Sequence, residues 1–228
     1  MPSPHPLDRP VWNALKTRQA SLARGDGQAL RFAPEYGPFA AAEDNSPASQ
    51  AALAGLAFGE DGLWLVEPRE AAAPPGMTAA LHAPCYQMIA RQITQADCPF
   101  AVIALDEGDA MQMLTLATLT RPGPFASHTH RLGAFVGVKQ YGRLVAMAGE
   151  RMQPDGFTEV SGVCTHPEHR GQGYASALLR IVAERILARG ETPFLHAYVT
   201  NTGAIELYKS LGFTYRRTVT LTVLKRGA

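Results

Sequence analysis

The stretch that decides the fold spans residues 160–190 and reads VSGVCTHPEHRGQGYASALLRIVAERILARG. Residues 157–165 predict a strand, and residues 173–189 predict a helix, because apolar side chains recur there at helical spacing up to a stop at Gly190. The loop between them carries Gly171 and Gly173. A strand, a glycine-bearing loop and a helix N-terminus form an anion site, since free backbone N–H groups and the helix dipole favour negative charge. A tight turn that starts the helix without any ligand is the alternative.

The spacing of this loop excludes two commoner phosphate-binding motifs. No Gly-Lys-Ser/Thr follows, so the loop is not a P-loop. No Gly-x-Gly-x-x-Gly occurs, so the dinucleotide fingerprint is missing. Both glycines still let the backbone come close to a phosphate, because no Cβ intervenes.

The predicted elements around this stretch indicate an α/β protein. In chain order they are a strand at 100–105, a helix at 109–119 with Asp106 as N-cap, a hairpin formed by 134–138 and 143–147, the strand and helix above, a strand at 194–199, a helix at 201–211 and a strand at 216–224. That order favours an α/β layer with a mixed sheet.

The N-terminal half is less regular and carries no chemical motif. Its predicted elements are a helix at 11–23, strands at 29–32 and 63–66, an Ala-rich helix at 49–58, a loop at 71–76, and a strand at 77–82 that Pro84 interrupts. We therefore expect a smaller α+β N-terminal lobe at residues 1–99 and a domain at residues 100–228 that carries the chemistry.

Composition narrows the function classes. The chain has 228 residues, of which 46% are hydrophobic, and a formal net charge of +1. That charge argues against broad binding to nucleic acid or to an anionic membrane. No apolar run is long enough to span a bilayer, and the first residues lack the pattern of a signal peptide. The three cysteines share no metal-type spacing, so we expect a cytoplasmic protein with free thiols and no bound metal.

Two motifs resemble those of the GNAT superfamily of acyl-CoA-dependent N-acetyltransferases. The first is Arg170-Gly171-Gln172-Gly173-Tyr174-Ala175, which matches the signature Arg/Gln-x-x-Gly-x-Gly/Ala and follows Val163-Cys164-Thr165-His166-Pro167. The second is the run from Asn201 through Ala204, Leu207 and Tyr208 to Gly212-Phe213, which is close to Asn-x-x-Ala-x-x-Leu-Tyr-x-x-x-Gly-Phe. The resemblance covers about residues 100–228 and implies a mixed, mostly antiparallel sheet flanked by helices. The N-terminal half resembles the degenerate lobe of glycine N-acyltransferase-like members only loosely.

The resemblance implies a role for each matched position. The loop from Arg170 to Ala175 would hold the coenzyme A pyrophosphate through backbone amides, and the strand at Val163, Cys164 and Thr165 would bind the pantetheine arm. Asn201 and Ala204 would contact the cofactor, although Asn201 also fits as the N-cap of its helix. Tyr208 would protonate the departing thiolate, and a tyrosine packed in the core is its alternative.

Glu159 is the acid of most interest, because alternation places it on the face of Ser161, Val163 and Thr165. A carboxylate there would take the proton of the acceptor amine, directly or through water. A salt-bridged or solvent-facing glutamate is the alternative. The run Ser127-His128-Thr129-His130 lacks the further ligands that a zinc site needs, and Cys164 has no histidine partner that would activate it.

These observations predict an enzyme that transfers an acetyl group from acetyl-CoA directly to a primary amine of a small molecule. The N-terminal half and the loop at 120–131 would shape the acceptor pocket. Two alternatives stay open: a non-catalytic acyl-CoA-binding or regulatory module, and transfer to a hydroxyl acceptor. We expect no nucleic-acid or membrane partner, and the oligomeric state stays open, with a homodimer among the options.

Overall fold

The computed structural model describes residues 5–57 and 62–227. Its α-helices are α1 (Pro10–Lys16), α2 (Pro47–Gly55), α3 (Ala110–Thr120), α4 (Tyr174–Ala188) and α5 (Thr202–Ser210). Its strands are β1 (Ala23–Gly25), β2 (Ala29–Phe32), β3 (Ala40–Ala42), β4 (Leu63–Glu67), β5 (Met77–Ile89), β6 (Ile103–Leu105), β7 (Phe135–Gln140), β8 (Arg143–Glu150), β9 (Phe157–Thr165), β10 (Thr192–Tyr198) and β11 (Thr214–Arg226). No helix in the described part of the chain is long and apolar enough to cross a membrane.

One large sheet organises the molecule. The described residues form an eight-stranded sheet in the order β4-β11-β5-β10-β9-β8-β7-β6, and a three-stranded sheet in the order β1-β2-β3. Neighbouring strands of the large sheet are antiparallel, except for the parallel pair β9 and β10. The predicted fold class, a mixed and mostly antiparallel sheet flanked by helices, is confirmed.

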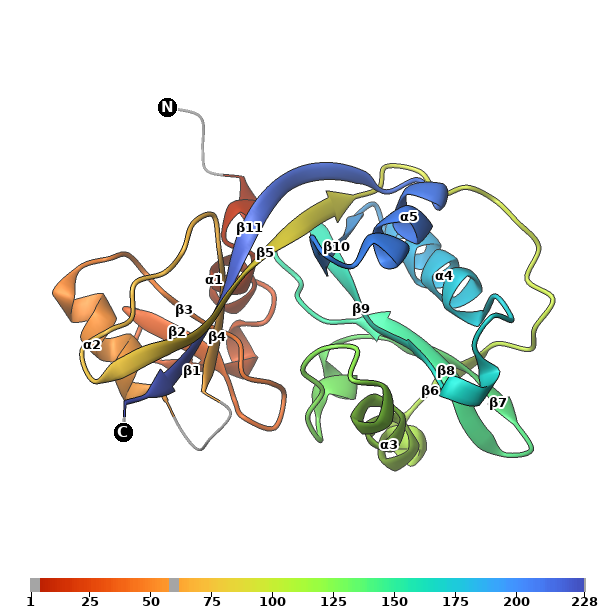
Figure 1. Ribbon diagram of the computed structural model, residues 1–228, viewed down its shortest axis with the longest axis horizontal. Helices are drawn as coiled ribbons and strands as arrows, with labels where there is room; N and C mark the ends of the chain where they lie inside the picture. Colours follow the sequence, from red (N-terminus) through yellow and green to blue (C-terminus); the bar gives the residue numbers. More distant parts are fainter. Residues whose placement is uncertain (1–4, 58–61, 228) are drawn as a thin grey trace.

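The N-terminal half contributes strands to this same sheet. β4 pairs with β11, and β5 lies between β11 and β10, so the boundary expected at residue 99 falls between strands of a single sheet. Figure 1 shows the result as two lobes, with the long strands β5 and β11 passing from one lobe into the other. α1, α2 and the small sheet form the body of the N-terminal lobe.

Helices cover both faces of the C-terminal part of the sheet. α4 packs through residues such as Leu178 and Val182 into one buried cluster with Val136 and Val160. α3 packs through Met113 and Leu116 into a second cluster with Phe135 and Met147. Phe135 and Val136 are consecutive residues of β7 and point to opposite faces, which places α3 and α4 on opposite sides of the sheet, as Figure 1 shows.

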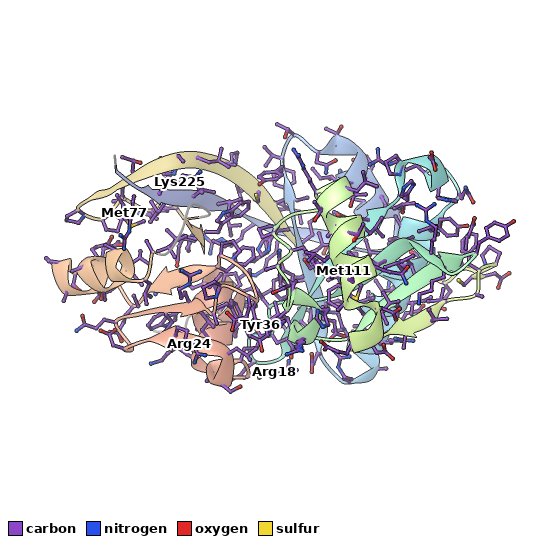
Figure 2. All side chains as sticks on the ribbon, turned by 90° about the horizontal axis from the view of Figure 1, so that it is seen from below. Arg18, Arg24, Tyr36, Met77, Met111 and Lys225 are labelled. Atoms are coloured by element: carbon purple, nitrogen blue, oxygen red, sulfur yellow. The ribbon has the colours of Figure 1, made fainter. Side chains whose placement is uncertain are left out.

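The N-terminal lobe also contacts the segment that follows α3. The Thr129 hydroxyl donates a hydrogen bond to the Tyr36 carbonyl at 2.8 Å, and the rings of Tyr36 and His128 lie 5.7 Å apart. In Figure 2, Tyr36 lies at the junction of the lobes, between the small sheet and α3, where Met111 is labelled. These contacts bring the loop at 120–131 against the N-terminal lobe.

Several expected elements differ in extent from those found, among them the strand expected at 100–105, which begins only at Ile103. The helix expected at 11–23 ends at Lys16, and residues 20–22 form a short 3-10 helix instead. The strand expected at 77–82 continues through Pro84 to Ile89. Pro84 is tolerated there because the pairing of β5 with β10 begins only at Cys85. The missing N–H of Pro84 therefore costs no ladder hydrogen bond on the β10 side. The helix expected at 49–58 is α2, and its expected last residue lies outside the described residues.

Candidate functional site

The loop before α4 presents unpaired backbone donors to solvent. Gly171 and Gly173 have φ of 78° and 84°, a conformation that favours glycine, and both are exposed. Gly173 is the N-cap of α4, and no side chain caps the helix. A Cβ at Gly171 would meet open space, and one at Gly173 would approach only the tip of Phe100 at 3.9 Å. The first N–H groups of a 15-residue helix are therefore free to bind an anion.

A gap between two strands leads away from this loop. β9 and β10 pair only over Phe157–Glu159 and Thr192–Phe194. Beyond Glu159 the two strands separate, and β9 keeps ladder pairs with β8 alone. The β10-facing backbone of residues 160–165 is thus open to an extended ligand, which would pair with it as a further strand does.

A cavity of about 930 Å³ lies where this gap meets the N-terminal lobe. Val163 and Ala175 line it at the end near the loop, and Tyr198, Asn201 and Tyr208 line it farther along. The lobe supplies Trp64 together with Arg31, Pro34, Gly37 and Pro38, and the segment after α3 supplies residues 120–126. Both segments that were expected to shape the acceptor pocket therefore border the cavity.

A smaller recess of about 140 Å³ continues from the cavity toward the sheet. The two share part of their lining: Trp64, Pro122, Gly123, Pro124, Tyr198, Asn201 and Tyr208. The rest of the recess is formed by Phe39, Val66, Cys85, Arg151, His196, Ala197 and Leu221. Most of these groups are apolar or aromatic, so the recess suits a small apolar body with few polar contacts.

The second motif places three expected residues at the cavity. Asn201, Ala204 and Tyr208 all line it. The Asn201 side chain accepts a hydrogen bond from the Ala204 N–H at 3.3 Å, so the N-cap role is confirmed and coexists with a position beside the cavity. Burial raises the pKa of Tyr208, and its hydroxyl has no hydrogen-bond partner among the described residues. The phenol therefore stays protonated at neutral pH and available to a ligand.

Other residues of the first motif serve the fold. The Tyr174 side chain is buried against Phe100, with ring centroids 4.5 Å apart, and its hydroxyl accepts a hydrogen bond from Gln140. Cys164 is buried in the α3 cluster, and burial raises the pKa of its thiol to about 11. The Thr165 hydroxyl is buried without a partner. These three positions offer a ligand only their backbone.

Arg170 and Gln172 lie on the exposed part of the loop and border neither the cavity nor the recess. Their side chains are free to reach a ligand that lies across the loop. They contribute backbone to the same turn as Gly171 and Gly173.

Glu159 is buried inside an ion pair. The Arg151 guanidinium donates from Nε to Oε2 at 2.8 Å and from Nη2 to Oε1 at 2.9 Å. His196 contacts Oε1 through Nδ1 at 2.8 Å. Burial alone would raise the pKa of this carboxyl, but the charge of Arg151 and the hydrogen bonds from His196 and Arg151 lower it to about 2. The carboxylate borders neither the cavity nor the recess, whereas Arg151 and His196 both line the recess.

The expected alternation of Glu159 with Val163 is wrong. β9 carries a bulge, because the register against β8 shifts between Ser161 and Cys164, and Gly162 has φ of 63°. The extra residue turns Val163 toward α4, on the same side as Val160. Glu159 faces the other side, toward His196. Strict period-two counting could not anticipate the bulge.

The hydrogen-bond network fixes the tautomer of His196. The Gln87 amide nitrogen donates to the Leu7 carbonyl at 2.9 Å, and the Gln87 oxygen accepts from Arg216 at 2.7 Å, so the amide orientation is set. The same nitrogen lies 3.1 Å from His196 Nε2, which must therefore accept. The proton is on Nδ1 and is donated to Glu159.

Histidines elsewhere do not join this site. His130 contacts Glu107 at 3.0 Å, and His128 packs against Tyr36. Within the described ranges, His166, Glu168 and His169 place donor atoms within 4.8 Å of one another, in the loop before Arg170. Glu168 is exposed there and no other described residue completes a coordination shell, so the absence of a metal remains a prediction.

Sequence reasoning missed Arg151, His196, Tyr198 and Trp64. One signal was available for two of them, because alternation along 194–199 puts His196 and Tyr198 on one face with Phe194. Arg151 and Trp64 carry no local signal. Both line the recess, Trp64 from β4 and Arg151 from the position that follows β8.

Comparison with known proteins finds solved structures that resemble this chain at different levels of sequence identity. A crystal structure from Novosphingobium aromaticivorans DSM 12444, described as an acetyltransferase of the GNAT family, is 50% identical over 99% of this chain and 100% of its own, with a TM-score of 0.92. A GCN5-related N-acetyltransferase from Kribbella flavida is 21% identical over 93% and 94% of the two chains, with a TM-score of 0.61. A GCN5-related N-acetyltransferase-like protein from Streptococcus suis 89/1591 is 16% identical over 95% and 92%, with a TM-score of 0.62.

The last two similarities concern the fold alone. A family model described as FR47-like protein matches residues 135–222, which include both motifs. No curated protein matches the sequence.

Proposed function

The chain belongs to the GNAT family of acetyltransferases, and from that premise we propose that it transfers the acetyl group of acetyl-CoA to the primary amine of a small molecule. The observation that carries the proposal is the path from the uncapped N-terminus of α4, along the open edge of β9, to a cavity bordered by the N-terminal lobe. The N-terminus of α4 suits a pyrophosphate, the open edge of β9 suits an extended arm, and the cavity suits an acceptor.

The residues present fit coenzyme A. Gly171 and Gly173 leave room for a phosphate where a Cβ would project, and the α4 N–H groups have no competing side chain. The N–H groups of β9 that face β10 are placed to bind the arm and to polarise the thioester carbonyl. Holding both substrates in one cavity supplies much of the rate through proximity.

We assign the proton for the leaving group to Tyr208. The amine nitrogen forms a bond to the thioester carbonyl carbon, and the carbon–sulfur bond breaks as the thiolate leaves. Tyr208 donates its phenolic proton to the sulfur and regains one from solvent. Its place on the cavity wall and its free hydroxyl support this role, and its raised pKa keeps the hydroxyl protonated at neutral pH.

The amine's proton follows a less direct route than expected. Glu159 is separated from the recess by Arg151 and His196, and a carboxylate with a pKa of about 2 is a weak base. We propose that His196 takes the proton at Nε2, exchanging its hydrogen bond with Gln87 for one with the acceptor. Glu159 is then a positioning residue, which holds Nδ1–H and stabilises the imidazolium that forms.

Release of free thiol from acetyl-CoA tests the proposal. The matched acceptors are 2-phenylethylamine and 2-phenylethanol, which differ only in the nucleophile. Thiol release with amines and none with alcohols supports the proposal. Release with the alcohol alone favours hydroxyl transfer, and binding of acetyl-CoA without release for any acceptor favours the non-catalytic module.

A further inference from the structure

We propose that the acceptor is an amine with an apolar body that also carries a carboxylate, and that the free end of the Arg151 guanidinium binds this carboxylate in the recess. The inference rests on the proposed function and names its substrate class. The observations that carry it are the geometry of Arg151, the charges around it and the shape of the recess.

Arg151 is held rigidly with one edge unused. Nε and Nη2 bind Glu159 side-on, and the guanidinium lies over the Phe39 ring at 4.5 Å. The Arg151 side chain is only 12% exposed. Nη1 has no hydrogen-bond partner among the residues that the structure describes, and it lies near the recess wall, 3.9 Å from where a Cβ on Gly123 would stand.

A guanidinium has five N–H donors, and Glu159 takes two of them here. The remaining pair at the Nη1–Nη2 end has the spacing of a carboxylate. A second carboxylate can therefore bind end-on while Glu159 stays side-on. Because Glu159 already fixes the side chain, little rotamer entropy is lost when the ligand binds.

Charge around the cavity favours an anionic group on the acceptor. Among the described residues that line the cavity and the recess, none is Asp or Glu. Arg121 and Lys225 add positive charge at the cavity, and both are exposed. Figure 2 shows Lys225 on the N-terminal lobe, far from Met111 on α3. A second ammonium would find no counter-charge in this lining, whereas a carboxylate finds Arg151.

The size and the walls of the recess define the body of the acceptor. Phe39, Trp64, Val66 and Leu221 supply rings and branched aliphatic groups around about 140 Å³. That volume suits a side chain of moderate size rather than a polymer. An apolar α-amino acid has all three features: a primary amine, a carboxylate and an apolar body.

The test uses pairs of acceptors that differ only in the carboxylate. L-phenylalanine is compared with 2-phenylethylamine, and L-leucine with 3-methylbutylamine, by kcat/KM with acetyl-CoA. A charge-assisted contact of this kind predicts a preference of about 10- to 100-fold for the carboxylate member. Arg151→Lys keeps a cation beside Glu159 but removes the paired N–H donors of the guanidinium. The preference in kcat/KM for the carboxylate member should therefore largely disappear. The control Arg189→Lys changes an arginine that also pairs with a buried glutamate, Glu150 at 2.9 Å, but borders neither space.

A second readout is binding of the products N-acetyl-L-phenylalanine and N-(2-phenylethyl)acetamide by calorimetry in the presence of coenzyme A. This measurement needs no turnover, so it can also be made on a variant with low activity. The inference is overturned if the wild type uses both members of each pair equally well. It is also overturned if Arg151→Lys leaves the preference for the carboxylate member intact. In both cases the acetyltransferase function stands. Failure of every amine to be acetylated overturns the proposed function, and the product-binding ratio then decides the inference by itself.

Discussion

Replacing Glu159 with Gln tests the buried ion pair on which the recess depends. The substitution keeps the shape of the side chain and one hydrogen-bond acceptor but removes the negative charge. Arg151 then stays in place, 12% exposed, without a counter-charge. We expect a large loss of stability at neutral pH, because a buried charge without its partner is costly.

The magnitude follows from the pKa of the carboxyl. Arg151 and His196 lower it from 4.5 to about 2, and at about 1.4 kcal/mol for each pKa unit this corresponds to roughly 3–4 kcal/mol. Breaking one side of a buried pair typically costs about 3–5 kcal/mol, which agrees. We therefore expect Glu159→Gln to lower the free energy of unfolding by about 3–4 kcal/mol at neutral pH.

The lowered pKa of Glu159 also fixes the sign of the pH dependence of stability. The stabilisation is fully present above the unfolded-state pKa of 4.5 and is lost as the pH falls toward about 2. The difference between wild type and Glu159→Gln should therefore stay constant down to about pH 5 and shrink to about half near pH 3. Urea unfolding followed by circular dichroism at several pH values measures it.

Glu107 offers the matched control. Arg131 and His130 also lower its pKa to about 2, but its side chain is 63% exposed. Solvent screens such a pair, so Glu107→Gln should leave the unfolding free energy near that of the wild type. If Glu159→Gln is as stable as the wild type at neutral pH, or if the difference does not shrink in acid, the burial argument for the pair is refuted.

Three further substitutions test the site. Gly173→Asp places a carboxylate where the pyrophosphate would bind, so coenzyme A affinity should fall strongly in a calorimetric titration. The control Gly190→Asp, at a glycine with a similar φ of 78° at the other end of α4, should leave the affinity unchanged. Tyr208→Phe should lower kcat by about 10²- to 10⁴-fold with little change in KM for acetyl-CoA, and a variant with wild-type kcat would leave Tyr208 as a core residue. His196→Gln should slow turnover at neutral pH and regain part of it at higher pH, where more acceptor amine is neutral; a pH–rate profile like that of the wild type would remove His196 from the proton step.

The C-terminal half was predictable because its elements are local. The strand at 157–165, the helix that follows and the hairpin turn at Tyr141-Gly142 lie where the hydrophobic period and the turn residues put them. Asn201 caps its helix as its position before the apolar run indicates. Each of these signals is contained within a few neighbouring residues.

What could not be predicted depends on contacts that are distant in sequence. Pro84 weakens any local case for a long β5, yet pairing with β11 and β10 extends that strand to Ile89. The bulge at Gly162 reverses the face of Val163 relative to Glu159 and depends on the register against β8. Arg151 becomes a site residue only because Glu159, eight residues later, folds back against it.

Detection of the acetylated acceptor by mass spectrometry decides whether the protein is an amine acetyltransferase. The purified protein is incubated with acetyl-CoA and a panel of small primary amines, and the free thiol released is measured in the same reaction. We expect one N-acetylated amine for each thiol released, and neither product with Tyr208→Phe beyond a small fraction of the wild-type rate. Binding of acetyl-CoA without any acetylated amine, or thiol release that does not depend on the amine, would contradict this expectation.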